Sequence, residues 1–334
     1  MSYTHHPKIE REKVYRTATI QRYLFAPVFL IMYIIRFFVR LFGKESSFLK
    51  FMFSKTLESF KEKKKAGFKG YTPSDKDVFA CCYSKSGTNW ILMITYQIAN
   101  KGKGEFDFIH DVVPWPHSPK EGFSVPLDHK MANESLTGLR PIKCNAELES
   151  PPYSKDAKYI CLLRDPKSVF VSAYHFVKSV MMGPMMPSVD TFLDLFLSDN
   201  FVAGDWASYA EEYWNWRTRP NVLFITFEEM KDDLEGNIQK IAKFMEVELT
   251  EDELKKVHHL SSYKHMKSID YKFAPGRIFP LGQKSSELIR TGKKNSSGEL
   301  LSKEQQNRID DYFITKLKER GSDFPYEEMY ANKL

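Results

Sequence analysis

Short apolar runs alternate with amphipathic stretches over most of the chain. Three of these runs have the length of buried strands and are bounded by turn residues; they cover residues 78–83, 159–163 and 222–227. Stretches with helical apolar spacing follow them, at 90–99, from about 167, and at 236–244. Strands that alternate with helices indicate a parallel sheet with helices on its faces. The pattern therefore predicts an α/β fold with a central parallel sheet, formed by one domain over residues 70–334.

The segment 23–42 differs from the rest, because it is apolar without interruption over 23–35 before Arg36 and Arg40 enter. A helix that spans a bilayer needs about 20 predominantly apolar residues, and basic side chains near one end can reach the membrane surface. Three alternatives stay open: an interfacial helix on a membrane, a single-pass signal anchor, and a buried helix pair that covers a core or an oligomer face. We expect the first, with residues 1–69 as an N-terminal extension. Its predicted place is the cytoplasmic face of a membrane rather than a single pass into a lumen.

The net charge and the cysteine spacing exclude few classes of function. The formal net charge of +6 suits an anionic ligand or an anionic membrane surface, and no nucleic-acid-binding motif is found. The cysteines lack the spacing of metal ligands, and adjacent Cys81 and Cys82 are expected on opposite faces of a strand. We therefore expect reduced, mostly buried thiols, no metal site and no nucleic-acid partner.

The candidate chemistry begins where the first predicted strand meets its helix, in the sequence Tyr83-Ser84-Lys85-Ser86-Gly87-Thr88-Asn89-Trp90. A strand that turns tightly into a helix presents free backbone N–H groups and the positive end of the helix dipole, which together bind anions. Lys85 adds a cation, and Gly87 permits close backbone approach. The first glycine of the nucleotide-triphosphate P-loop is missing, and the lysine precedes the glycine. Alone, the turn indicates either an anion site or an ordinary polar turn.

A second candidate anion site begins at Arg164, which ends the second predicted strand. Its planar guanidinium suits a phosphate group, and the hydroxyl of Ser172, about two turns into the next helix, can complete the site. Neither motif is specific by itself. The two motifs together, in this order and about 80 residues apart, are specific.

With both motifs, the chain resembles the cytosolic-type sulfotransferases, which use 3'-phosphoadenosine 5'-phosphosulfate (PAPS). That family has a Tyr-Pro-Lys-Ser-Gly-Thr-x-Trp loop, in which Ser84 replaces the proline, and an Arg-Asn-Pro-Lys-Asp-x-x-Val-Ser block that Arg164 and Ser172 match. Further segments are similar in the same order, at 222–231, 261–267 and 289–292. The resemblance implies a P-loop-like sulfotransferase fold, PAPS as the cofactor and 3'-phosphoadenosine 5'-phosphate (PAP) as the product.

The resemblance also implies roles for single residues. Lys85 and Lys143 would be catalytic, with Lys85 at the bridging oxygen of the leaving phosphate. This role agrees with the physical demand of sulfuryl transfer, which places negative charge on the leaving oxygen. The implied nucleotide-binding residues are Lys85, the backbone of Ser86, Gly87, Thr88 and Asn89, the adenine neighbours Trp90, Ser262 and Tyr263, and the 3'-phosphate ligands Arg164, Ser172, Arg290 and Gly292. Phe227 and Thr291 belong to the same site but replace a tyrosine and a lysine of the family.

The chain departs from the family at the catalytic base. The family's Lys-Thr-His triplet corresponds to Lys143-Cys144-Asn145, and an amide cannot act as a general base near neutral pH. In one alternative, Glu147 or a histidine of the preceding loop (His110, His117 or His129) supplies the base. In another, the acceptor is a phenol or an amine that needs little help. In the last, the protein binds PAPS but has lost transfer activity.

Three segments are expected to form an acceptor pocket: 102–135, 174–186 and 265–285. The methionine-rich run 181–186 is flexible and apolar, and with the N-terminal segment it indicates a lipophilic acceptor such as a sterol, a retinoid-like alcohol or a lipid. The predicted function is sulfuryl transfer from PAPS to a hydroxyl or amine of a small lipophilic acceptor. The alternative is a catalytically impaired PAPS-, PAP- or lipid-binding relative at a membrane. The family's dimer motif is not recognisable, so a homo-oligomer stays possible.

Overall fold

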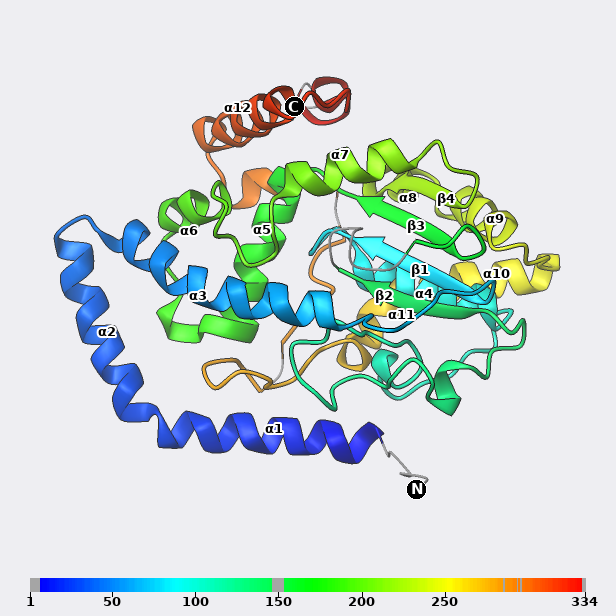
Figure 1. Cartoon of the computed structure of the whole chain (residues 1–334), viewed down its shortest axis with the longest axis horizontal. Helices are drawn as coiled ribbons and strands as arrows, with labels where there is room; N and C mark the ends of the chain where they lie inside the picture. Colours follow the sequence, from blue (N-terminus) through cyan, green and yellow to red (C-terminus); the bar gives the residue numbers. More distant parts are fainter. Residues whose placement is uncertain (1–6, 146–152, 285, 293, 295, 332–334) are drawn as a thin grey trace.

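A parallel sheet forms the centre of the computed structural model, which describes residues 7–145, 153–284, 286–292, 294 and 296–331. Within these residues the sheet has four strands in the order β2-β1-β3-β4 (Figure 1). They are β1 (Asp77–Cys82), β2 (Arg140–Cys144), β3 (Lys158–Leu163) and β4 (Val222–Thr226). The predicted α/β fold is confirmed. The apolar pattern misses β2, because its five residues include Arg140, Pro141 and Lys143.

Successive strand residues alternate between two hydrophobic cores, one on each face of the sheet. Cys81 packs in one core and Cys82 in the other, as predicted for neighbours on a strand, and all four cysteines are buried and free. The core that contains Cys81 is covered by α5 (Pro166–Phe176), α6 (Val189–Phe196), α7 (Trp206–Trp216) and α12 (Lys303–Glu319). The core that contains Cys82 is covered by α4 (Thr88–Ala99), α8 (Phe227–Asp232), α9 (Leu234–Phe244), α10 (Glu251–Ser261) and α11 (Tyr263–Ser268).

The start of α5 is fixed directly after Arg164. The side chain of Asp165 accepts a hydrogen bond from the backbone N–H of Lys167 at 2.9 Å, and Pro166 occupies the first helical turn, where its missing N–H costs nothing. The ammonium of Lys167 is buried against Asp310 of α12. Arg164 is therefore held on a rigid junction between β3 and α5.

The sheet order creates a crevice between β1 and β3. These strands are neighbours, yet β1 continues into α4 on one face and β3 continues into α5 on the other. Ligands of open α/β sheets bind at the carboxyl ends of such a pair of strands. The two predicted anion motifs both lie at this point.

Irregular segments surround the crevice. The regular structure in the predicted loop 102–135 is limited to two short 3-10 helices, η1 (Ile109–Asp111) and η2 (Lys130–Ala132). The remaining short elements are η3 (Val177–Met182), η4 (Gly183–Met185), η5 (Asp270–Lys272), η6 (Ser296–Glu299) and η7 (Glu327–Ala331).

The N-terminal extension consists of α1 (Pro7–Leu24), α2 (Ala26–Leu41) and α3 (Glu45–Ala66). In Figure 1, α1 runs along one side of the body, α2 lies at its edge, and α3 returns across it. No single described helix is long and apolar enough to cross a membrane, whereas α1 and α2, bent by 63°, pass the length and composition test together. The predicted segment 23–42 is thus interrupted by a bend near its start.

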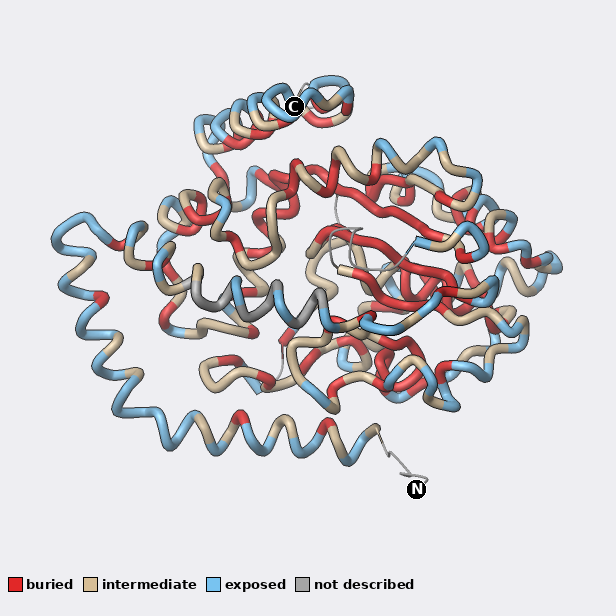
Figure 2. The backbone as a smooth tube through the Cα atoms, viewed as in Figure 1, coloured by how far each residue is buried: buried red, intermediate tan, exposed pale blue. Residues whose placement is uncertain are grey.

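Helix α2 contacts the rest of the protein on one face, and most of its length is exposed or half-buried (Figure 2). Arg36 is the buried residue of this helix, and its guanidinium donates hydrogen bonds to Glu45 at 2.6 Å and to the carbonyl of Met185 at 2.7 Å. Exposed apolar side chains cover the remaining faces: Val28, Leu30, Ile31, Tyr33, Ile34, Ile35, Phe37, Phe38 and Leu41. The alternative in which this segment is buried in a core of the chain is therefore contradicted, the alternative of an oligomer face stays open, and the side chain of Arg36 points to the protein.

Candidate active site

The turn between β1 and α4 provides one wall of a pocket. Lys85 and Gly87 both have left-handed backbone conformations, with φ of 71° and 103°, and Gly87 directly precedes the first turn of α4. A Cβ atom on Gly87 would lie 2.9 Å from the ring of Phe227. Glycine is required there by conformation and by space. The turn thereby points the free N–H groups of α4 toward the crevice.

Lys85 places an ammonium group inside the pocket. Its Nζ lies 4.2 Å from the ring centroid of Phe176. Burial, and then repulsion from Arg164, lowers the pKa of Lys85 to about 8. Because the low pKa reflects a poorly solvated cation, a bound anion would restore the charged form.

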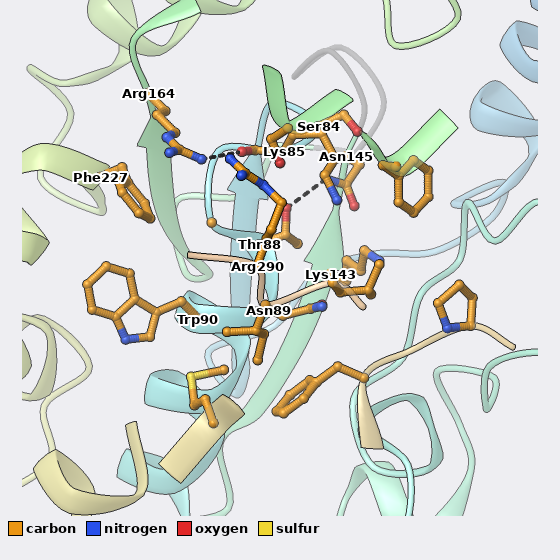
Figure 3. A pocket seen from close by; sticks show the side chains of 18 of the residues that line it. Ser84, Lys85, Thr88, Asn89, Trp90, Lys143, Asn145, Arg164, Phe227 and Arg290 are labelled. Carbon is orange, nitrogen blue, oxygen red and sulfur yellow. Dashed lines mark hydrogen bonds between the residues drawn. The ribbon is translucent and has the colours of Figure 1, made fainter. Parts of the chain in front are cut away.

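Arg164 faces Lys85 across the crevice from the end of β3 (Figure 3). Its Nη1 donates to the carbonyl of Lys85 at 3.4 Å, and its guanidinium stacks over the ring of Phe227 at 4.1 Å. Phe227 packs edge-on against Trp90, with ring centroids 5.4 Å apart, and Trp90 donates through its indole N–H to Ser261 at 2.8 Å. Arg164 therefore lies beside an aromatic wall.

A second cation and a second aromatic ring lie at the rim. Tyr263 donates from its hydroxyl to the carbonyl of Arg290 at 3.0 Å. A Cβ on Gly292 would lie 2.4 Å from the Tyr263 ring, so only glycine lets this loop pass the tyrosine. The guanidinium of Arg290 forms an ion pair with Glu299. Arg290 thus lines the pocket, and its guanidinium is already paired with the carboxylate of Glu299.

Two basic side chains meet deeper in the pocket. Lys143 Nζ lies 3.3 Å from His110 Nε2 and 3.4 Å from the ring centroid of Trp115. Burial lowers the pKa of Lys143 to about 7, with a further contribution from Lys85. Burial, and then the charge of Lys143, holds the pKa of His110 well below its usual value.

Asn145 connects β2 to the anion turn. Its Nδ2 donates to the carbonyl of Cys82 at 3.0 Å and to Thr88 Oγ1 at 3.3 Å (Figure 3), and its carbonyl accepts from Tyr209 at 3.1 Å. Its Oδ1 is buried and has no hydrogen-bond partner among the described residues. An acceptor oxygen for a ligand proton is therefore present where the family has its histidine.

A single pocket of about 430 Å³ gathers nearly all the predicted site residues. The predicted residues that line this pocket are Lys85, Gly87, Thr88, Asn89, Trp90, Lys143, Asn145, Arg164, Ser172, Phe227, Ser262, Tyr263, Arg290, Thr291 and Gly292. Ser86 is buried beneath the turn and has a hydroxyl without a partner in the described part of the chain. Glu147 lies outside the described residues. Of the loop histidines, His110 and His117 line the pocket, whereas His129 caps η2.

The pocket continues into an apolar end. All three segments predicted for the acceptor contribute to this end, although Met181 is the one residue of the methionine-rich run that lines the pocket. The aromatic and aliphatic side chains at this end are those of Trp115, Phe123, Phe176, Met181, Met266, Phe273, Ile278 and Phe279. Sequence reasoning did not single out Trp115, Phe123, Phe273 or Phe279, although aromatic residues in a polar loop are a usable signal.

Comparison with known proteins agrees with this architecture. The Sulfotransferase domain family model matches residues 75–321. Sulfotransferase 2A6 of Mus musculus is 33% identical over 201 residues, covering 59% of this chain and 68% of the relative. Sulfotransferase 1E1 of Homo sapiens is 29% identical over 225 residues, covering 65% and 75%.

Solved structures share the fold. A mouse sulfotransferase complexed with PAP has a TM-score of 0.60 at 23% identity, covering 77% of this chain and 89% of that one. Retinol dehydratase in complex with androsterone and PAP has a TM-score of 0.63 at 19% identity, covering 81% and 88%. The family model spans most of the chain and includes both anion motifs and the loops around them. The chain therefore belongs to the sulfotransferase family, whose shared chemistry is sulfuryl transfer.

Proposed function

We propose that the protein transfers a sulfuryl group from PAPS to a hydroxyl group of a small lipophilic acceptor. One observation carries the proposal: a single pocket begins at the cations Lys85 and Arg164 and ends in an apolar, aromatic wall. A doubly anionic donor suits the first end and a lipophilic acceptor suits the second. An amine acceptor is the alternative nucleophile.

The chemistry of the cationic end favours a nucleotide with two anionic groups. Lys85 and the N-terminus of α4 suit the 5'-phosphosulfate, because a helix N-terminus with a lysine is a strong anion site. Arg164 and Arg290 suit the 3'-phosphate through planar donor geometry. Trp90 offers an aromatic face for adenine. Two of the fold relatives were solved with PAP, which supports this assignment.

The apolar end suits a ring system or a long hydrocarbon chain. Ligand pockets of about 300–1,000 Å³ bury most of a small ligand, and this pocket, at about 430 Å³, lies within that range. Androsterone and retinol occur in the retinol dehydratase structures, so lipophilic alcohols are the natural first acceptors to test here.

The proposed reaction is an in-line displacement at sulfur. PAPS supplies the sulfuryl group; the acceptor oxygen forms the new S–O bond, and the bond between sulfur and the phosphate oxygen breaks. Lys85 neutralises the charge that develops on that leaving oxygen, since a preorganised cation in a water-poor site is effective there. Walls on both sides of the crevice orient the reactants, which supplies much of the acceleration.

We further propose that α2 lies on the cytoplasmic face of a membrane. A helix of 16 residues is about 24 Å long, shorter than the roughly 30 Å of a bilayer core. Its outward faces are apolar, and Arg36 keeps the helix against the protein. Arg22 and Arg40 at the helix ends suit anionic headgroups.

Incubation with radiolabelled PAPS tests the transfer. The panel contains retinol, androsterone, 2-naphthol and an arylamine, and Lys85→Met is the matched inactive control. We expect a labelled product with at least one alcohol and none with Lys85→Met. PAP binding without any product would support the alternative, a nucleotide-binding relative that no longer transfers.

Vesicle flotation tests the membrane proposal. We expect the protein to float with anionic vesicles, and Phe37→Asp to reduce flotation because the charge would enter the headgroup region. Leu136→Asp is the matched control, because Leu136 is equally exposed but lies far along the chain from α2. Equal flotation of the unaltered protein and Phe37→Asp would contradict the proposal.

A further inference from the structure

Lys143 and His110 form a pair whose hydrogen bonding can be assigned from geometry. His110 Nδ1 lies 3.0 Å from the carbonyl of Val113. A carbonyl only accepts, so Nδ1 carries the proton and Nε2 keeps its lone pair. That lone pair faces Lys143 Nζ at 3.3 Å. Lys143 is therefore the donor, and His110 fixes the direction of its amine.

The surroundings of Lys143 favour its neutral amine. The side chain is buried, and no ion pair among the described residues includes it. The titratable groups facing it are His110 from η1, Lys85 from the turn after β1, and Cys82 at the end of β1. A second lysine and a buried position both disfavour an ammonium.

We propose that Lys143 is the general base of the transfer and that His110 is the residue that positions it. The inference deepens the proposed function and rests on it. In the step, the acceptor oxygen attacks sulfur while its proton passes to the lone pair of Lys143 Nζ. The S–O bond to the phosphate breaks, PAP leaves with that electron pair, and Lys143 becomes an ammonium. The ring of Trp115, 3.4 Å from Nζ, stabilises this cation.

The other candidates in the described site are less suited to take the proton. Both ring nitrogens of His110 are engaged, one by Val113 and the other by Lys143. The amide of Asn145 is not basic, although its unpartnered Oδ1 can hold the acceptor hydroxyl before transfer. Lys143 combines a basic atom, a place in the pocket and a direction fixed by His110. His117 also lines the pocket, with its ring packed edge-on against Phe68, and it is the rival base that the comparison of acceptors below tests.

The test compares an acceptor that needs a base with one that does not. Retinol keeps its hydroxyl proton at any ordinary pH, whereas 4-nitrophenol is largely ionised at mildly alkaline pH. We expect Lys143→Met to lower kcat for retinol by roughly 10²–10⁴-fold and to leave 4-nitrophenol much less affected. A merely structural defect would slow both acceptors alike.

Two substitutions of His110 separate positioning from proton acceptance. His110→Gln keeps an oxygen that accepts a hydrogen bond from Lys143, so we expect it to retain most activity with retinol. His110→Leu removes the acceptor, and we expect it to lose activity with retinol while the thermal shift caused by PAP is unchanged. Loss in His110→Gln equal to that in His110→Leu would show that His110 itself takes the proton.

Failure of the base assignment is distinguishable from failure of the proposed function. If the unaltered protein transfers sulfuryl groups and Lys143→Met slows both acceptors equally, Lys143 is not the base and the proposed function stands. If the unaltered protein binds PAP but transfers to no acceptor, the proposed function and the base both fall.

Discussion

Arg11 of α1 and Asp111 of η1 form a buried ion pair. Asp111 directly follows His110, and Arg11 also lies over the ring of Phe108 at 4.4 Å. Val14 and Tyr15 of α1 pack nearby against the small core formed by Phe108, Phe123, Val180 and Ile278. The N-terminal extension is therefore part of the wall behind the acceptor end of the pocket.

Breaking this ion pair should weaken the acceptor site. Arg11→Met leaves Asp111 buried without its cation, which costs about 3–5 kcal/mol when a pair is truly buried. We expect the KM for retinol to rise and the PAP-induced thermal shift to stay the same, as measured by steady-state kinetics and thermal unfolding.

The double variant Arg11→Met/Asp111→Asn is the control for this prediction. It removes the uncompensated charge, so it should recover part of the lost stability and acceptor affinity. An unchanged KM in Arg11→Met would mean that α1 docks without influencing the pocket.

Glu299 should compete with the nucleotide for Arg290. It holds the Arg290 guanidinium, and its own charge would repel a phosphate at this rim. Both side chains are partly exposed, so the effect is modest, up to about 1 kcal/mol or roughly fivefold in Kd. We expect Glu299→Gln to bind PAP more tightly in calorimetric titration, and Glu304→Gln, an exposed neighbour in the first turn of α12, to bind it unchanged. Weaker binding by Glu299→Gln would contradict this role.

The pH dependence of kcat/KM should be bell-shaped. The base Lys143 must be neutral, so activity rises as pH increases through about 7. Lys85 must be charged to stabilise the leaving group, so activity falls as pH rises through about 8. Because kcat/KM reports the free enzyme, these pKa values apply before the nucleotide binds.

The substitution Lys85→Arg checks the fall of activity at high pH. Lys85→Arg keeps a cation that does not titrate in this range, so the fall at high pH should disappear in whatever activity remains. Persistence of that fall in Lys85→Arg would assign it to another group.

Asn145→His should reduce the dependence on Lys143. The imidazole would stand where the family has its histidine and could take the acceptor proton. We expect Lys143→Met to cost at least tenfold less in the Asn145→His background than in the unaltered chain. Asn145→Ala supplies no base, so the cost of Lys143→Met should stay as large there.

The sequence predicts best those site residues that lie within one local motif. Gly87 and Arg164 each lie between the end of a strand and the start of a helix. Neighbouring residues explain the conformation of both turns: a glycine in the left-handed conformation forms the first, and an Asp-Pro pair starts the helix after the second. Their approach across the crevice follows from two neighbouring parallel strands.

Contacts between irregular segments were not predictable in this way. His110 was one of three loop histidines, and its place beside Lys143 depends on the path of a long loop and on β2, a strand that apolar patterning misses. The position of Arg36 near one end of the apolar segment would let its side chain reach a membrane surface, yet the guanidinium binds Glu45 and a carbonyl 149 positions away. Such contacts are decided by tertiary packing, which hydrophobic periodicity does not encode.

Thermal unfolding with and without PAP tests the central claim, a PAPS site at the carboxyl ends of β1 and β3, most directly. At a PAP concentration near 100 times its Kd, binding to the folded state adds about 2.7 kcal/mol, which raises Tm by several degrees. We predict this shift in the unaltered protein and its loss in Arg164→Ala. No shift in the unaltered protein at such concentrations, or the same shift in Arg164→Ala, would contradict the account.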